Sequence, residues 1–216
     1  MHAFLSYQTD ERATAAKVSE LLKKMGITCF MAHEHIEVSA EWRLELLRQL
    51  GLAELFVPIL SKKYYESIWC KQESGIAAFR SVTVVPLSID GSVPQGFLGH
   101  IQSTKINPDE PTFKDLVPGI AKHDVSFLVD AITTIISGSG NYRKAESNFE
   151  LILPYLDRAT DAQITELLKV STRNNQVCNA GLCAQTYLPP LFTSHGHLLD
   201  DATKKELSET LDRYKK

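Results

Sequence analysis

The fold of this chain is indicated by two neighbouring stretches, Leu55-Phe56-Val57-Pro58-Ile59-Leu60-Ser61 and Ser67-Ile68-Trp69-Cys70-Lys71-Gln72-Glu73. The first stretch is nearly all apolar, which is typical of a strand buried on both faces of a sheet. Pro58 lacks an N–H group and therefore predicts a local irregularity in that strand. The second stretch begins a predicted helix over residues 68–80. A buried strand followed by a helix is the repeating unit of a parallel sheet.

The same alternation extends in both directions from these stretches. It predicts strands over residues 3–7, 27–32, 55–61 and 82–89, and helices over residues 11–25, 41–50 and 68–80. Gly26 is expected to end the first helix. Residues 101–124 contain three prolines and Gly119, so we expect a turn-rich segment there. The first part of the chain is therefore predicted to be an α/β domain with a short parallel sheet flanked by helices.

The remainder of the chain has helical periodicity only. Helices are predicted over residues 125–136, 146–156, 161–170, 179–188 and 200–214, with a break at residues 138–141 and a stop at Pro189-Pro190. These patterns divide the chain into an α/β domain, 1–124, and an all-α domain, 125–216. The role of the helical domain is open between a restraint on the first domain and a module that recruits a partner.

Composition restricts the classes of partner. The chain has 216 residues and a formal net charge of -3, so it lacks the basic excess that nucleic acid or an anionic membrane would require. No apolar run approaches the ~20 residues that span a bilayer. Residues 1–7 lack the charged region and long apolar run of a secretory signal, and the four cysteines form no CxxC pair. We therefore expect a cytoplasmic protein with free thiols.

The candidate chemistry lies at the start of the helix over residues 68–80. Trp69 and Glu73 are four residues apart, which places both side chains on one helical face, one turn apart. An aromatic ring beside a carboxylate could hold a flat heterocycle and stabilise a positive charge next to it, but the same spacing also suits a core tryptophan near a solvent-exposed glutamate. In parallel sheets ligands bind at the carboxyl ends of the strands, which is where this pair is expected.

Other common catalytic motifs are missing from the sequence. GxGxxG, GxxxxGK[ST] and GxSxG do not occur, so phosphate-loop chemistry and a nucleophile elbow are unsupported. The two HxH pairs, His33/His35 and His195/His197, are weak indications of a metal, and we expect none.

Four segments together resemble a bacterial Toll/interleukin-1 receptor (TIR) domain over about residues 1–120. They are Phe4-Leu5-Ser6-Tyr7 with Asp10, then Phe30 to Ile36, then Glu41-Trp42, and finally Ser67-x-Trp69-Cys70-x-x-Glu73. The resemblance implies a flavodoxin-like fold, and for many bacterial members it implies cleavage of NAD⁺ at the nicotinamide–ribose bond. Some members produce a cyclic ADP-ribose-type signal in antiphage defence, which a separate effector reads. NAD⁺ would be a substrate, and no cofactor is implied.

The resemblance also assigns roles to individual residues. Glu73 matches the catalytic glutamate and Trp69 the tryptophan of the WxxxE motif. The other substrate-binding positions that it implies are Phe4, Ser6, Tyr7 and Phe30. Residues 33–40 match the BB loop, which mediates self-association of TIR domains; its assembly residues would be His33, Glu34, His35, Ile36 and Glu37.

Two other functions remain open on the sequence. A non-enzymatic TIR adaptor would act by TIR–TIR assembly alone, and a small-nucleotide receptor of the same parallel-sheet class would bind its ligand without consuming it. Turnover of NAD⁺ distinguishes the enzyme from both.

Overall fold

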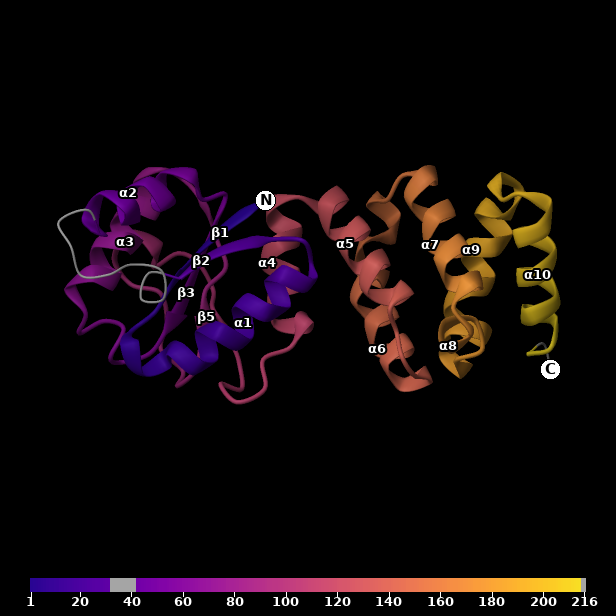
Figure 1. Ribbon diagram of the computed structural model, residues 1–216, viewed down its shortest axis with the longest axis horizontal. Coiled ribbons are helices and arrows are strands. Elements are labelled where there is room, and N and C mark those ends of the chain that lie inside the picture. Colours follow the sequence, from indigo (N-terminus) through magenta and orange to yellow (C-terminus); the bar gives the residue numbers. More distant parts are fainter. Residues whose placement is uncertain (32–41, 215–216) are drawn as a thin grey trace. The chain divides into compact units, whose positions relative to one another are not determined.

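The computed structural model describes residues 1–31 and 42–214 (Figure 1). The chain forms two compact units, Met1–His123 and Asp124–Lys216. A helix of at least 18 residues with the hydropathy to cross a membrane does not occur within the described ranges.

The first unit is built on a parallel sheet. Its described strands are β1 (His2–Ser6), β2 (Thr28–Met31), β3 (Leu55–Leu60), β4 (Thr83–Val84), β5 (Leu87–Ser88) and β6 (Thr104–Lys105). Their order is β2-β1-β3-β5-β6, and β4 also pairs with β3. The predicted parallel sheet is confirmed, and β3 is buried at every residue as its apolar sequence indicates.

The predicted strand over residues 82–89 is divided into β4 and β5. The amino-terminal half of β3 pairs with β4 and its carboxyl-terminal half pairs with β5, so its partner changes beside Pro58. This change of partner is the irregularity that the proline indicated, because Pro58 cannot donate a hydrogen bond to a neighbouring strand.

The described helical elements of this unit connect the strands. They are η1 (Thr9–Glu11), α1 (Arg12–Lys24), α2 (Trp42–Leu52), α3 (Ile68–Phe79), η2 (Gly96–Leu98) and α4 (Phe113–His123). The prediction of a turn-rich segment over residues 101–124 holds for residues 101–112 apart from β6, but it was wrong for residues 113–123, which form α4. Pro118 is inside α4 but is tolerated because one face of this helix, including Leu116 and Ile120, is buried. A Cβ at Gly119 would lie 2.5 Å from Val85, so only glycine permits this close approach.

The second unit is helical, as predicted. Its described elements are α5 (Val125–Ser137), α6 (Tyr142–Ile152), η3 (Leu153–Arg158), α7 (Asp161–Arg173), α8 (Asn175–Cys178), η4 (Cys183–Tyr187), α9 (Leu188–His195), η5 (Gly196–Leu198) and α10 (Asp201–Asp212). Side-chain caps at Asp124, Asn141, Thr160 and Asp200 begin four of these helices.

Two details of the second unit differ from the sequence predictions. Pro189 and Pro190 do not stop a helix, since the helical run continues through them from η4 into α9. The helix predicted over residues 179–188 is present from residue 181 onward, but it includes the π-helical segment η4 and continues into α9. The core of the unit contains Ile132, Phe149, Leu167 and Leu188, all fully buried.

Candidate active site at the carboxyl ends of β1 and β3

The site lies where the order of the sheet reverses. From β1 the chain continues to β2 on one side, and β3 then pairs with β1 on the other side. Loops leave the sheet in opposite directions at such a point and open a crevice at the carboxyl ends of the strands. Here these ends are Ser6 of β1, which pairs with Pro58, and Leu60 of β3.

Helix α3 brings Glu73 to the carboxyl ends of these strands. Ser67 caps the helix by accepting a hydrogen bond from the N–H of Cys70 at 3.3 Å. Further along the helix, the Glu73 carboxylate accepts a hydrogen bond from Ser6 Oγ, with 2.5 Å between Oγ and Oε2. Glu73 is only 4 % exposed. A carboxylate from the helix after β3 is thus joined to the last residue of β1.

Three hydroxyl groups continue from this carboxylate, and we call Ser6, Tyr64 and Ser74 the hydroxyl chain. Tyr64 Oη lies 2.9 Å from Ser6 Oγ and 2.9 Å from Ser74 Oγ. It also lies 3.4 Å from the carbonyl oxygen of Cys70. Tyr64 is fully buried, so its hydroxyl depends on these partners. The hydroxyl chain thus connects Glu73 to Ser74, the next residue of α3, by way of Ser6 in β1 and Tyr64 in the loop after β3.

Burial dominates the electrostatics of the site. It raises the pKa of Glu73 from 4.5 to about 7, although the hydrogen bond from Ser6 acts in the opposite direction. Burial also raises the pKa of the Cys70 thiol to about 11 and that of Tyr64 well above 10, so both groups are neutral near pH 7. Glu73 therefore gains and loses its proton near neutral pH, as is common for functional carboxylates.

A second buried carboxylate, Glu11, ties the two loops together. Its Oε1 accepts a hydrogen bond from Ser61 Oγ at 2.5 Å, and its Oε2 accepts one from the N–H of Gln8 at 3.0 Å. Ser61 Oγ in turn accepts from the N–H of Tyr64 at 3.0 Å. Burial raises the pKa of Glu11. These contacts fix the position of Tyr64 relative to β1.

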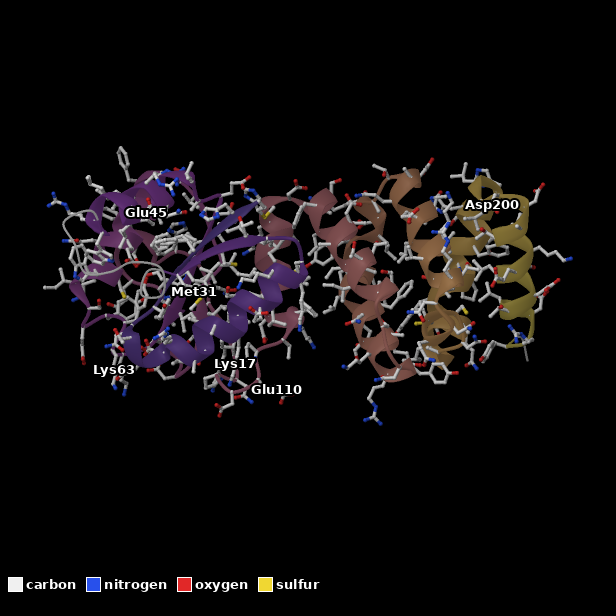
Figure 2. The ribbon with its side chains drawn as sticks, viewed as in Figure 1. Lys17, Met31, Glu45, Lys63, Glu110 and Asp200 are labelled. Carbon is white, nitrogen blue, oxygen red and sulfur yellow. The ribbon has the colours of Figure 1, made fainter. Side chains whose placement is uncertain are left out.

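An exposed ion pair joins the same two loops. Lys63 Nζ binds the carboxylate of Asp10 (Lys63 is labelled in Figure 2). Both side chains are more than half exposed, so this pair adds little stability.

Trp69 lies one turn from Glu73 on α3, as the spacing predicts, and is 41 % exposed. Its ring meets that of Trp42 edge to face, with 4.3 Å between the ring centroids and 84° between the planes. Half-exposed aromatic surface is available at this position for a ligand. This contact joins the first residue of α2 to α3.

The other predicted substrate-binding residues are placed differently. Phe4 and Phe30 lie in the hydrophobic core beside α2 and α3, 0 % and 5 % exposed, with their ring centroids 5.4 Å apart. A ligand cannot stack on rings that are enclosed in this way, so we do not retain them in the candidate site. Ser6 and Tyr7 lie at the end of β1, and Tyr7 is 2 % exposed. The predicted assembly residues His33, Glu34, His35, Ile36 and Glu37 are outside the described residues.

Sequence reasoning did not single out Tyr64, Ser74, Glu11 or Ser61. A signal for two of them was present, because Ser61 and Tyr64 directly follow the buried strand β3. Their partners lie 50 and 58 residues away along the chain, respectively, so no local spacing reveals the contacts.

A parallel sheet of this order, with helices on its faces, defines a flavodoxin-like domain, and a buried carboxylate lies at its switch point. Comparison with known families identifies it further: the TIR domain pattern matches residues 3–117. This match covers more than half of the chain, which therefore belongs to the TIR domain family. A search of curated proteins found no match.

The described residues contain no group of three or more His, Cys, Asp and Glu side chains that could hold a metal ion. His195, one of the predicted weak candidates, has other partners: its Nδ1 lies 2.7 Å from Ser194 Oγ and its Nε2 lies 3.5 Å from an Asp161 carboxylate oxygen.

Proposed function

We propose that this TIR domain cleaves NAD⁺ at the nicotinamide–ribose bond, with Glu73 as the catalytic carboxylate. The observation that carries the proposal is the buried carboxylate of Glu73, hydrogen-bonded to Ser6 at the switch point, with a half-exposed tryptophan one helical turn away. TIR domains include NAD-cleaving enzymes and adaptors, and this arrangement favours the enzyme.

The chemistry needs a negative charge near the ribose. Breaking the glycosidic bond of NAD⁺ gives the ribose oxocarbenium character, as in glycoside hydrolysis. Nicotinamide leaves as a neutral molecule, so a general acid is not required. The ionised form of Glu73 would stabilise the cation or hold the ribose hydroxyls, and low solvent exposure strengthens that attraction.

Ser6 and Trp69 have distinct supporting roles in this proposal. Ser6 donates a hydrogen bond to Glu73 Oε2 and so fixes this oxygen, and the other oxygen would then face the substrate. Trp69 would provide a wall for a flat ring and exclude water. Attack by water on the ribose would give ADP-ribose, whereas attack by an adenine nitrogen would give a cyclic product.

The burial of the Glu73 side chain has a consequence for how activity is regulated. A carboxylate that is 4 % exposed must be uncovered before a ribose can touch it. Activity should therefore depend on a rearrangement, and TIR–TIR association is the candidate trigger because TIR domains commonly self-associate.

The test is incubation of the full chain with NAD⁺, followed by chromatographic measurement of free nicotinamide and the nucleotide products. Protein concentration should be varied widely. We expect nicotinamide release whose specific activity rises with protein concentration, because assembly uncovers the site. A folded protein that releases no nicotinamide at any concentration would refute the proposal.

An adaptor acting by assembly alone is the second candidate, and exposed apolar side chains favour it. Leu44 and Leu47 of α2 are 63 % and 44 % exposed, and Ile68 and Phe79 of α3 are 69 % and 91 % exposed. Large exposed apolar residues on two neighbouring helices suit contact with another protein. Concentration-dependent association without NAD⁺ turnover would favour this function over the enzyme.

A further inference from the structure

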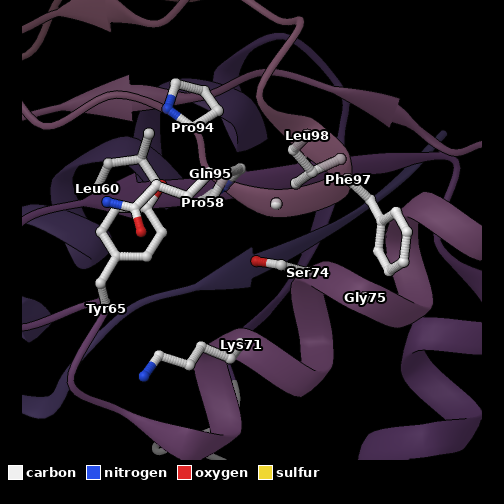
Figure 3. A pocket seen from close by; sticks show the side chains of 11 residues that line it. Pro58, Leu60, Tyr65, Lys71, Ser74, Gly75, Pro94, Gln95, Phe97 and Leu98 are labelled. Carbon is white, nitrogen blue, oxygen red and sulfur yellow. The ribbon is translucent and has the colours of Figure 1, made fainter.

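A cavity of about 300 Å³ lies beside α3 (Figure 3). Its lining comes from the end of β3, the loop after it, helix α3 and the segment 94–98. Glu73 and Trp69 are not among the described residues that line it. The volume suits a small ring system rather than an entire dinucleotide.

The walls of the cavity are apolar and its aromatic side is held in place. The apolar lining residues include Pro58, Leu60, Pro94 and Leu98. The ring of Tyr65 is fixed by a hydrogen bond from its hydroxyl to the carbonyl oxygen of Val93 at 2.7 Å and by an edge-to-face contact with Tyr64. Phe97, which is 83 % exposed, adds a second aromatic side chain at the mouth. A planar ring could bury its faces here.

Two polar side chains of α3 reach the same cavity. Lys71 and Ser74 are three residues apart and therefore share one helical face (Figure 3). No carboxylate within residues 1–31 and 42–214 forms an ion pair with the Lys71 ammonium. An ammonium and a hydroxyl on one side of an apolar cavity are suitable donors for a carboxylate, which would gain charge-assisted hydrogen bonds.

Ser74 is also the end of the hydroxyl chain. When Glu73 is ionised it can only accept, so Ser6 donates to it, Tyr64 donates to Ser6, and Ser74 donates to Tyr64. The Ser74 proton is then engaged and its oxygen can only accept from a ligand. When Glu73 is protonated the chain can reverse, and Ser74 becomes free to donate into the cavity.

We propose that this cavity binds a planar aromatic carboxylate and that its occupant and Glu73 influence each other through the hydroxyl chain. A carboxylate at Ser74 requires a donor there, and so favours the protonated form of Glu73. Linkage then requires that protonation of Glu73 strengthens binding by the same factor.

The groups around Glu73 do not supply this coupling themselves. Tyr64 and Cys70 keep their protons near neutral pH because burial raises the pKa of each. Glu11 is the other buried carboxylate of the site, and its oxygens bind Ser61 and Gln8 rather than a member of the hydroxyl chain. Lys71 faces the cavity as the electrostatic partner of the ligand.

The experiment is a titration of the full chain with naphthoate, observed through the backbone amide signals in NMR. Naphthamide, which is neutral, is the matched control ligand. We expect shifts at Lys71 to Gly75 and at residues 94–98, with a dissociation constant on the order of 1 mM for a fragment of this size. Naphthamide should bind at least about tenfold more weakly. Failure of naphthoate to shift these signals, or equal binding of both ligands, would overturn the proposal.

Two variants locate the site. Lys71→Met keeps the length of the side chain and removes its charge, so naphthoate affinity should fall about tenfold. Gly75→Leu places a side chain in the cavity, where a Cβ meets no atom within 4 Å, so the fold should persist while binding is lost. Unchanged affinity in either variant, with the native spectrum retained, would place the ligand elsewhere.

The pH dependence tests the coupling. Naphthoate stays ionised between about pH 6 and pH 8, a range that spans the Glu73 pKa of about 7. Binding to the wild type should be several-fold tighter at the lower pH, and the difference should disappear in Glu73→Gln. A pH dependence that persists in Glu73→Gln would overturn the coupling, and so would its absence in the wild type.

Discussion

Replacement of Glu73 by glutamine should stabilise the first unit, and the gain should depend on pH. Burial raises the pKa of Glu73 from 4.5 to about 7. The difference, about 2.5 pH units at ~1.4 kcal/mol per unit, corresponds to about 3 kcal/mol of folding free energy. The folded state therefore resists ionisation of Glu73, whereas the unfolded state does not.

The direction of this pH dependence follows from the number of protons that the folded and unfolded states bind. Between pH 4.5 and about 7 the unfolded chain has lost the Glu73 proton while the folded protein retains it, so the wild type loses stability as pH rises through this window. The loss is complete above about pH 7 and absent below 4.5. Glutamine cannot ionise, so Glu73→Gln should become relatively more stable by up to about 3 kcal/mol across the window.

The assay is urea unfolding at a series of pH values, followed by tryptophan fluorescence. Both tryptophans of the chain, Trp42 and Trp69, belong to the first unit, so this signal reports on the unit that contains Glu73. Glu66→Gln removes an exposed carboxylate after β3 and is the matched control for loss of charge. The buried amide that Glu73→Gln introduces can lower the free energy of unfolding by an amount that does not depend on pH. The change of the stability difference with pH is therefore unaffected. A stability difference that is flat between pH 4.5 and about 8 would refute the reasoning.

Three further predictions concern the same unit. Tyr64→Phe removes the middle of the hydroxyl chain and should cost about 1–2 kcal/mol in urea unfolding; an unchanged midpoint would contradict it. If ionised Glu73 is catalytic, kcat/KM for NAD⁺ should fall about tenfold per pH unit below about pH 7, and a profile flat through pH 7 would count against this role. A fragment of residues 1–124 should show α/β circular dichroism because the first unit has its own core; a random-coil spectrum would be the opposite result.

The sheet, and the place of the candidate site at its edge, follow from local patterns in the sequence. Apolar runs such as Leu55–Leu60 mark buried strands, and strand–helix alternation implies parallel pairing. The four-residue spacing of Trp69 and Glu73 placed them one turn apart without knowledge of the tertiary structure. The carboxyl ends of strands then indicate where a ligand binds.

The details that could not be predicted depend on contacts between distant residues. Tyr64 reaches Ser6 across 58 positions of sequence, so the hydroxyl chain has no local signature. The position of Phe4 in the sequence motif predicts a residue that lines the pocket, but its side chain on β1 lies in the hydrophobic core. Helix α4 was missed because Pro118 and Gly119 suggest a turn, whereas burial of one face of this helix stabilises it.

The central claim is that the buried carboxylate of Glu73 performs NAD⁺ cleavage. The most direct measurement is nicotinamide release by the wild type, Glu73→Gln and Glu66→Gln at equal concentrations, with folding checked by circular dichroism. Loss of one charge at the transition state should lower the rate about 10²–10³-fold in Glu73→Gln and leave Glu66→Gln close to the wild type. If folded Glu73→Gln released nicotinamide as fast as the wild type, the claim would be contradicted.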